Sequence, residues 1–476
     1  MIKLITTLFL AFLSTGLFAQ TSNLERVEPA FWWTGMKNPK LQLLVHGQDI
    51  SSRTVKLNYP GVKLAAVHKV ENPNYLFLDL EIAASAKTGS FPILFAASGK
   101  PNLQYKYELK ARNLSANRAQ GVTSKDVIYL LMPDRFSNGD KNNDVVKGLK
   151  ESTLNRDSIY HRHGGDIQGL MNHLDYLKDL GVTALWMTPE IENDQPHASY
   201  HGYAVTDYYK IDPRFGTNEL YKAYVEKCHS MGLKVVKDLV HNHIGTESWL
   251  IKDMPMKDWV HQWPKYTNSN FRDAAVMDPH GSAIDKKVML DGWFDHSMAD
   301  VNQTNPYVQN YLTKYKVGMA LLLTIRGIPQ LYYGDEILMK NYSNPDGLVR
   351  LDFPGGWPGD KVDKFTASGR TEKENEAFNF VRKLANYRKN TTALQTGKLM
   401  QYIPQDGVYV FFRYDQQKTV MIAYNSSDKA AAVKTGRFAE RTGDFTKALN
   451  VMSGEQINAI DNLNLAAKSI TILELK

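Results

Sequence analysis

Residues 234–243 read Lys-Val-Val-Lys-Asp-Leu-Val-His-Asn-His, a short apolar run that ends in a cluster of polar side chains. An apolar run of this length is typical of a buried strand, and parallel sheets are built from such strands. In folds made of parallel βα units, the polar residues at the carboxyl ends of the strands carry the function. The stretch therefore predicts a parallel sheet with Asp238 and His243 at its functional edge.

Three other segments have the same form, an apolar strand followed by polar residues. The four candidate strands are Asp126–Met132, Thr183–Thr188, Lys234–Val240 and Ile328–Tyr333. From residue 125 onward such strands alternate with amphipathic helices, which is the pattern of parallel βα units. Residues 125–390 are therefore predicted to form one βα domain.

The regions on either side of this domain have a different pattern of apolar runs and turns. Residues 24–118 carry short apolar runs separated, at roughly 8–12-residue spacing, by turns rich in Gly, Pro and Asn, which predicts a small β-sandwich. Residues 119–123 are expected to be a linker. Residues 391–476 return to strands and turns and are predicted to form a second β-sandwich.

The composition is that of a folded protein outside the nucleic-acid-binding class. Of 476 residues, 43% are hydrophobic and 22% are charged. Lys and Arg exceed Asp and Glu by 57 − 50 = 7, and this excess is spread thinly, which argues against a nucleic-acid surface. The single Cys228 excludes an internal disulfide and a cysteine-based metal cluster. The 25 tyrosines fit either a β-rich core or platforms that stack on sugar rings.

The first residues predict export. Lys3 precedes the apolar stretch Leu4–Leu13, and small residues before Gln20 complete the pattern of a signal peptide covering residues 1–19. The stretch is too short to span a bilayer as a helix, and no cysteine follows it as a site for a lipid anchor. We therefore expect a periplasmic or secreted protein without a membrane anchor.

Polar motifs follow all four candidate strands. In chain order they are Pro133–Asp140 with Asn142–Asp144, Pro189–Asn193 with Tyr200–Tyr203 and Asp207–Tyr209, Asp238–His243, and Tyr332–Glu336. In this order they closely resemble the α-amylase family (glycoside hydrolase family 13), and in particular its cyclomaltodextrinase and neopullulanase branch. The opening stretch Phe31–Met36 also resembles the N-terminal module of that branch. The resemblance implies an N-terminal β-sandwich, a (β/α)8 barrel of the TIM type and a C-terminal β-sandwich.

The resemblance also implies sugar-binding roles for His201, Tyr203, Asp238, His243, Asp346 and Arg350. Tyr203 would stack on the sugar at the cleavage subsite, which His201 would line. His243 would hydrogen-bond to a sugar hydroxyl, and Asp238 would support the floor of the site. Asp346 and Arg350 resemble an Asp/Arg pair that holds the neighbouring sugar. A glucose ring has apolar faces and a rim of hydroxyls, so stacking and bidentate hydrogen bonds suit it. Taken alone, a segment such as Asp238–His243 would equally fit a solvated strand end.

The family further implies a calcium site, for which the candidates are Asn138, Asp140, Asn143, Asp144, Gly164 and Asp166. Ca²⁺ takes six to eight oxygen ligands from carboxylates, amides and backbone carbonyls, and the glycine would contribute its carbonyl oxygen. An ordinary Asn/Asp-rich turn is the alternative. His161 and His163 have no carboxylate at matching spacing, so we expect both to be loop histidines rather than ligands of a transition metal.

The catalytic segments of the family are not found in this sequence. A retaining glycosidase needs a nucleophile and a general acid about 5–5.5 Å apart. In the family these are an Asp and a Glu at the ends of the fourth and fifth strands, with a His-Asp pair ending the seventh. Here Val301–Pro306 resembles the stretch just before the fourth strand, and Lys314–Arg326 already resembles the helix before the eighth. We predict an internal loss of four βα units, about 125 residues at roughly 31 per unit, with the join near Thr313 and Lys314.

Strands one, two, three and eight could still pair as an 8-1-2-3 parallel sheet with two open edges. Asp335 and Glu336 are poor substitutes for the missing pair, because adjacent residues of an extended strand point apart. One hypothesis is a shortened, exported α-glucan hydrolase that would cleave α-1,4 bonds of maltooligosaccharides, cyclomaltodextrins or pullulan. The others are a non-catalytic α-glucan-binding remnant and a poorly folding product. N-terminal modules of this kind often pair subunits, which leaves a homodimer open.

Overall fold

The computed structural model describes residues 24–36, 38–112, 121–273, 278, 280–302, 304–308, 311, 330–339, 350–425, 427, 429–467 and 469–476. The predicted signal peptide, the join near Thr313 and Lys314, and Asp346 lie outside these residues. The chain divides into two compact units, one made of Met1–Ser115 with Pro255–Lys257 and the other of Ala116–Met254 with Asp258–Lys476. Among the described residues, no helix is both long and apolar enough to cross a membrane.

The first unit contains the β-sandwich that the sequence predicts. One sheet has the order β1 (Leu24–Glu28), β3 (Lys40–Gly47), β6 (Tyr75–Ile82), β5 (Val62–Lys69), and the other β2 (Phe31–Trp33), β8 (Lys100–Lys110), β7 (Gly89–Ala97), β4 (Thr54–Leu57), with one 3-10 turn, η1 (Ile50–Ser52). In β7, Phe91, Ile93 and Phe95 are buried while their neighbours Pro92 and Leu94 are exposed, as the period of two in a strand requires. These side chains form one core with those of the opposite sheet, such as Leu43 and Leu78.

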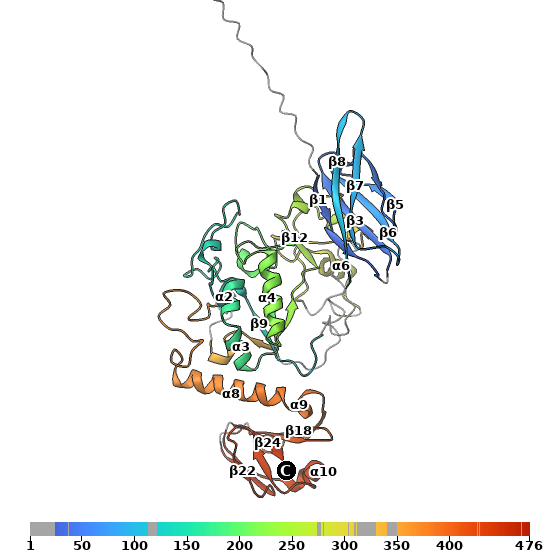
Figure 1. The fold of residues 1–476 in the computed structure, drawn as a ribbon. Coiled ribbons are helices and arrows are strands. Elements are labelled where there is room, and N and C mark those ends of the chain that lie inside the picture. The colour runs from blue at the N-terminus through green and yellow to red at the C-terminus, as the bar shows by residue number, and fades with distance from the viewer. Residues whose placement is uncertain are drawn as a thin grey trace, which may run out of the picture. The chain divides into compact units, whose positions relative to one another are not determined.

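The second unit is organised by a four-stranded parallel sheet, one strand of which, β9, is labelled in Figure 1. Its order is β13 (Lys234–Lys237), β10 (Ala184–Met187), β9 (Ile128–Leu131), β16 (Gln330–Tyr332), and every neighbouring pair is parallel. Each strand lies inside one of the four predicted segments. The eighth strand of the family pattern therefore pairs directly with the first, and the predicted 8-1-2-3 order is confirmed.

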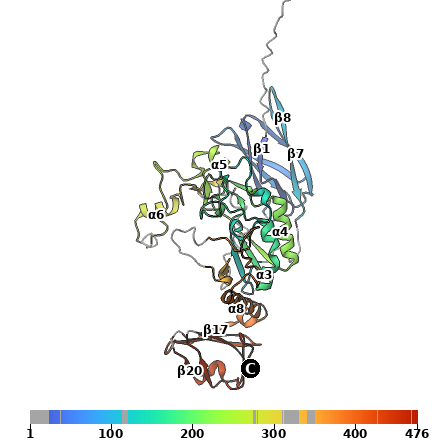
Figure 2. The same cartoon turned by 90° about the vertical axis from the view of Figure 1, so that its left-hand side faces the viewer.

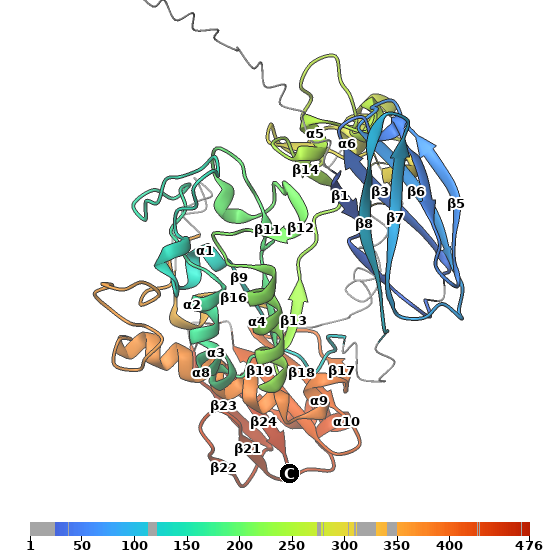
Figure 3. The same cartoon turned by 45° about the horizontal axis from the view of Figure 1, so that its top comes forward.

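Helices α2 (Ile167–Asn172), α3 (Leu174–Leu180) and α4 (Asn218–Ser230) lie together on one side of this sheet (Figure 3). The Thr217 side chain caps the first turn of α4, and α3 ends at Gly181, whose φ of +97° places it in the left-handed region. The long helix α8 (Glu372–Lys389) begins with a capping box between Thr371 and Glu374 and packs against α3.

Short elements form the loops at the carboxyl ends of the strands. They are α1 (Pro133–Phe136), η2 (Lys141–Asn143), β11 (Ile191–Glu192), η3 (Ser199–His201), β12 (Asp207–Ile211), β14 (His243–Gly245), α5 (Trp249–Lys252), η4 (Lys257–Trp259), α6 (Ala283–Asp291), β15 (Met298–Asp300) and η6 (Asp335–Ile337). β11 pairs with β12, and β14 pairs with β15, in two separate antiparallel ladders. Neither ladder joins the parallel sheet.

The C-terminal part of the second unit forms the second predicted sandwich, whose strands include β17 and β20 in Figure 2. Its main sheet has the order β17 (Lys398–Gln401), β18 (Val408–Tyr414), β19 (Thr419–Asn425), β24 (Ser469–Leu475), β21 (Ala448–Asn450), β22 (Gln456–Ile457), and β20 (Ala431–Lys434) pairs with β23 (Asn462–Leu465). The short helices are α9 (Thr392–Gln395), η8 (Thr435–Phe438) and α10 (Ala439–Thr442). Leu394 of α9 packs on Val420 and Ile472 of the main sheet, which closes its second face.

Asp335 and Glu336 correct one expectation. They lie in the 3-10 turn η6 rather than on an extended strand. Glu336 is fully buried and accepts hydrogen bonds from the hydroxyls of Tyr129 and Tyr176 at 2.8 and 2.7 Å. Asp335 instead accepts from the backbone of Tyr332. The two carboxylates therefore do point apart, but because of a tight turn and not because of strand alternation.

Candidate functional site

Asp238 lies just beyond β13, where the third strand of the sheet ends. Its Oδ2 accepts hydrogen bonds from Trp186 Nε1 at 3.0 Å and from the Tyr203 hydroxyl at 3.2 Å. Trp186 stands in β10 beside Val236, so its indole is on the face of the sheet that Asp238 continues. Burial raises the pKa of Asp238, although both hydrogen bonds favour the charged form. The carboxylate is thus fixed in orientation between an indole and a phenol.

The turn at η3 presents His201 and Tyr203 side by side. The backbone N–H of Tyr203 donates to His201 Nδ1 at 2.9 Å, and the two rings stack with centroids 5.9 Å apart. Gly202, between them, has φ +83°, and a Cβ at this position would lie 1.9 Å from the carbonyl oxygen of Pro189. Only glycine fits there. The Tyr-His-Gly-Tyr motif is therefore a local structure that sets an imidazole against a phenol.

His243 begins β14 and joins the same group from the opposite loop. Its Nε2 lies 3.1 Å from the carbonyl oxygen of Tyr203, to which it donates. The ring of Phe294 stacks on His243 at 5.0 Å, and the ring of Phe271 stacks on Phe294 at 5.2 Å. Phe271 is 43% exposed and Phe294 38% exposed. A row of stacked rings thus runs from the site out to solvent.

Both histidines of the site are neutral near pH 7. Burial and the positive charge of Arg350 lower the pKa of His201 to about 4. Burial also lowers the pKa of His243 to about 4. A neutral imidazole carries one donor and one acceptor. Since Tyr203 already bonds to His201 Nδ1 and His243 Nε2, each ring offers a sugar hydroxyl one further hydrogen bond at most.

Arg350 reaches the η3 turn from the segment that follows β16. Its Nη1 donates to the hydroxyl of Tyr200 at 3.0 Å, and Tyr200 is 1% exposed. The guanidinium of Arg135 lies 4.2 Å above the same phenol ring. Since Asp346 is outside the described residues, the predicted Asp/Arg pair stays a prediction.

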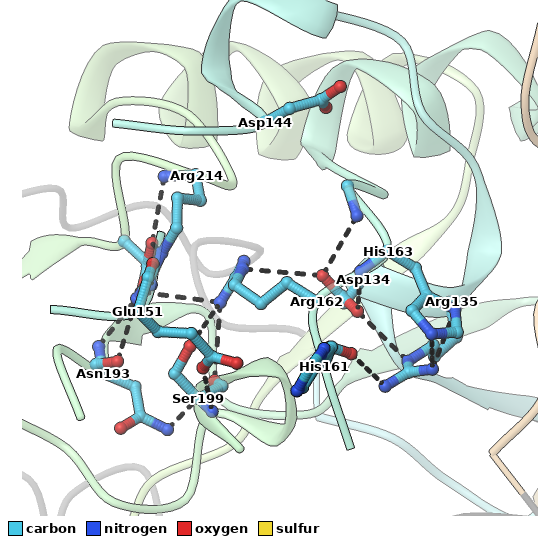
Figure 4. Close-up of polar contacts among 12 residues, drawn as sticks. Asp134, Arg135, Asp144, Glu151, His161, Arg162, His163, Asn193, Ser199 and Arg214 are labelled. Atoms are coloured by element: carbon cyan, nitrogen blue, oxygen red, sulfur yellow. Dashed lines mark hydrogen bonds and ion pairs between the residues drawn. The ribbon is translucent and has the colours of Figure 1, made fainter. Parts of the chain in front are cut away.

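A network of buried charges fixes the loops behind the η3 turn (Figure 4). Arg214 donates to Asp212 through Nε at 2.9 Å and through Nη2 at 2.8 Å. Arg162 Nη1 lies 4.0 Å from Asp212 Oδ2 and 3.3 Å from the hydroxyl of Ser199, the first residue of η3. Burial alone would raise the pKa of Asp212, but Arg162 and Arg214 hold it well below its usual range.

The network continues to Asp134, which lies between two guanidinium groups. Asp134 is 3.6 Å from Arg162 Nε and 3.1 Å from Arg135 Nε, and all three side chains are buried. Arg135 Nη2 also donates to the carbonyl of His161 at 2.7 Å, while His163 pairs with Asp352 and contacts Arg135. His161 and His163 thus belong to this loop network, as loop residues.

Three of the predicted calcium ligands meet between two loops. Asn138 Nδ2 donates to Asp144 Oδ1 at 2.7 Å. Gly164 has φ +88°, and a Cβ on it would lie 2.6 Å from Asp144 Oδ1. The side-chain oxygens of Asn138 and Asn143 are buried and accept no hydrogen bond from any described group. Among the described residues no group of three His, Cys, Asp or Glu suits a metal. A cation here would therefore depend on amide and main-chain oxygens as well as Asp144, which is the mixed oxygen set that Ca²⁺ accepts.

Asp140 and Asp166 hold the loops around that point. Asp166 Oδ2 accepts from the backbone N–H groups of Gly139 and Asp140 at 3.1 and 2.8 Å, and its Oδ1 caps α2 by accepting from Gly169 at 2.6 Å. Asp140 accepts from the backbone of Asn142 at 3.0 Å. Burial raises the pKa of Asp166 to about 6.

The structure brings His201, Tyr203, Asp238 and His243 together, and places Arg350 beside the same turn. Sequence reasoning missed Trp186, although it stood inside a predicted strand. The sequence feature that could have identified Trp186 is the alternation of side chains along a strand. Once the register of β10 against β13 is known, this alternation puts Trp186 on the same face as Val236 and Asp238. It also missed Phe294, because no local pattern links residue 294 to residue 243.

Three family models match successive parts of the chain. They describe the N-terminal domain of cyclomaltodextrinase over residues 26–113, the α-amylase catalytic domain over 130–318 and the cyclomaltodextrinase C-terminal domain over 399–474. A cyclomaltodextrinase of Thermoanaerobacter pseudethanolicus is 25% identical over 435 residues, which is 65% of this chain and 72% of that enzyme. Neopullulanase 2 of Thermoactinomyces vulgaris is 32% identical over 200 residues, which is 39% of this chain but 30% of that enzyme.

Solved structures show the same fold. A cyclomaltodextrinase aligns with TM-score 0.53 and 16% identity over 97% of this chain and 100% of that chain. The α-amylase of Geobacillus thermoleovorans, complexed with acarbose, aligns with TM-score 0.56 and 20% identity over 75% of this chain and 99% of that one.

The alignment with the first relative is longer than the part of this chain that it covers. Since 65% of 476 residues is about 309, an alignment of 435 residues leaves more than a hundred positions of that enzyme without a counterpart here. The number is close to the predicted loss of about 125 residues, whose place in the chain stays a prediction.

Proposed function

The chain belongs to the α-amylase family of glycoside hydrolases, with terminal domains of the cyclomaltodextrinase type, and from that premise we propose that it binds α-glucan oligosaccharides at the carboxyl ends of β10 and β13. Its named relatives act as cyclomaltodextrinase, neopullulanase and maltogenic amylase. In this proposal the chain binds the sugar as its relatives do but does not hydrolyse it.

The observation that carries the proposal is the assembled group around Asp238. An oriented carboxylate, two neutral imidazoles and the Tyr203 ring lie within one hydrogen-bonded set. A glucose ring offers an apolar face for the phenol and hydroxyls for the other groups. The exposed row of Phe294 and Phe271 continues from His243 and supports contact with more than one sugar.

The Tyr203→Ala variant is expected to bind maltoheptaose at least tenfold more weakly than wild type, as measured by isothermal titration calorimetry or NMR titration. Removing the ring deletes the stacking surface, and a tenfold loss corresponds to about 1.4 kcal/mol. Tyr203→Phe keeps the ring and loses only the hydrogen bond to Asp238. It is expected to keep most of the affinity.

A matched control is Tyr424→Ala, which removes a 43% exposed tyrosine from β19 of the C-terminal sheet. It should leave binding unchanged. Equal affinity in wild type and Tyr203→Ala, with a loss in Tyr424→Ala, would move the binding surface to the C-terminal sandwich and contradict the proposal.

We also propose that Asn138, Asn143, Asp144 and the Gly164 carbonyl would hold a calcium ion. The buried, unbonded amide oxygens and the close approach of Gly164 to Asp144 support this assignment. The ion would be structural: it would neutralise Asp144 and join the loop after β9 to the loop before α2.

Millimolar Ca²⁺ is expected to raise the melting temperature of wild type relative to EDTA by a few degrees. A ligand that binds only the native state contributes about 2.7 kcal/mol at a hundredfold excess over Kd. Asp144→Ala should abolish the rise, whereas Asp157→Ala, an exposed carboxylate of a nearby loop, should keep it. Calorimetric melting curves that coincide in calcium and EDTA for wild type would speak against the ion.

We also propose that the protein is exported, because residues 1–19 have the pattern of a signal peptide. The N-terminal sequence of the protein recovered from periplasm or medium tests it. A mature chain that begins at Gln20 is expected, and an intact Met1 would contradict export through this leader.

A further inference from the structure

The sheet of the second unit has four parallel strands, which is half the number in an eight-stranded barrel. Its order, β13-β10-β9-β16, is the order 3-2-1-8 that these strands would have in a complete barrel. Within the described residues, β13 and β16 each pair with one strand of this sheet only. Their outer edges therefore present backbone N–H and C=O groups that a further parallel strand could use. We propose that the sheet of a second copy of this chain completes the barrel in solution.

The geometry of closure favours an identical partner. All four strands run in the same direction, and the two open edges lie on opposite sides of the sheet. A two-fold axis parallel to the strands places β16 of one copy beside β13 of the other, and β13 beside β16, with all eight strands parallel. Both open edges are used, and the resulting C2 assembly is closed.

The side chains on the open face have the matching pattern. Val236, Trp186, Leu130 and Tyr332 form one row across the sheet, on the face opposite to that of Tyr129. Tyr129 is fully buried toward α3, whereas Trp186, Leu130 and Tyr332 are only partly buried. A barrel interior is filled by layers of four side chains taken from alternate strands, so four strands supply two of each four. A second copy would supply the other two.

The open edges carry few of the features that usually prevent pairing. Lysines on an edge strand usually disfavour pairing with a further strand. In β13, however, Lys234 is paired with Asp126 and Lys237 with Glu190 inside the same chain. The described residues of β16, Gln330–Tyr332, have no charge. This inference rests on the sheet alone and does not depend on glucan binding.

The test uses the full chain and measures its mass and its contacts. Wild type is expected to sediment as a dimer of twice the chain mass. In a Cys228→Ser background, Leu331→Cys is combined in turn with Val235→Cys, Lys237→Cys or Leu239→Cys. These positions differ by even numbers, so each register keeps the same face outward. At least one pair should form a covalent dimer under mild oxidation.

A disulfide within one chain is excluded by distance. Residues 235 and 331 are three strand spacings apart, about 14 Å, and a disulfide needs Cα atoms within about 7 Å. Leu331→Cys alone should give no covalent dimer, because β16 of one copy meets β13 of the other. A monomeric wild type overturns the proposal, since the face would then be covered within one chain. A dimer that none of the three pairs can link also overturns it and moves the contact to another surface, such as the N-terminal sandwich.

Discussion

Purified protein is expected to release no more reducing ends from maltoheptaose, pullulan or β-cyclodextrin than a boiled sample does. Enzymes lower reaction barriers by an amount on the order of 8–23 kcal/mol, and a retaining glycosidase cannot start its reaction without a nucleophile and a general acid. We predict that the segments carrying the nucleophile and the acid are missing, because the motifs that mark them in the family are not found in the sequence. The expected effect is therefore a loss of many orders of magnitude relative to the family.

The structure supports this expectation through the sheet. The only strands that the described residues between β13 and β16 form are β14 and β15, and these two make a separate ladder outside the parallel sheet. The strands whose ends would hold the catalytic pair thus have no counterpart in this sheet among the described residues.

Three carboxylates of this unit among the described residues are already engaged. Asp238 is held by Trp186 and Tyr203, and Glu190 pairs with Lys237. Glu336 is buried against two tyrosines on the helix side of the sheet. A retaining pair requires two carboxyl groups that flank a sugar, one of them ready to protonate the leaving oxygen.

The assay counts reducing ends, with a cyclomaltodextrinase of full family length as the positive control. Turnover above about 1 s⁻¹, the low end of typical enzymes, would show that a catalytic pair exists after all. In that case Asp238→Asn and Glu190→Gln would be the first variants to locate it.

The fold was predictable because its signals are local. Apolar strands that end in polar motifs gave the four strand positions, and the order of the motifs gave the pairing of β16 with β9. The conformation of residues 335–337 was not predictable in this way. Gly334, with φ +91°, bends the chain just after Tyr333 and starts a 3-10 turn, so that Glu336 enters the layer between the sheet and α3.

The site was predictable only in part, because its remaining members depend on tertiary contacts. Tyr203, Asp238 and His243 stand in motifs, but Trp186 joins them through strand register and Phe294 through a loop more than fifty residues away in sequence. Asp212 is a similar case. The local sequence does not predict that two arginines contact Asp212, because one of them, Arg162, lies fifty residues earlier in the chain.

The Asp212→Asn variant is expected to lose about 3–5 kcal/mol of unfolding free energy, the typical cost of removing one partner from a buried ion pair. The substitution keeps the shape of the side chain and leaves Arg162 and Arg214, 2% and 1% exposed, without their main counter-charge. Urea unfolding at pH 7, followed by tryptophan fluorescence, measures the change. Because Arg162 also donates to Ser199 at the start of η3, maltoheptaose affinity should fall in the same variant.

Asp179→Asn is the matched control, since it makes the same substitution in an exposed pair. Asp179 and Arg382 are 52% and 46% exposed at 2.7 Å, and such pairs contribute about 0–1 kcal/mol. If Asp212→Asn lowers the free energy of unfolding no more than Asp179→Asn does, the buried network has no structural role of this size.

The pH dependence separates the charge of Asp212 from its packing. The pKa of Asp212 is held well below its usual range in the folded protein, while an unfolded aspartate titrates near about 3.9. The unfolded state therefore takes up a proton first as the pH falls, so the stabilisation is complete above about pH 5, begins to fall near about pH 4, and is lost only as the pH approaches the much lower pKa of Asp212 in the folded protein. The stability difference between wild type and Asp212→Asn should stay constant from pH 8 to pH 5 and narrow below about pH 4. A difference that persists undiminished at about pH 3 would mean that the variant loses packing or hydrogen-bond geometry rather than a charge.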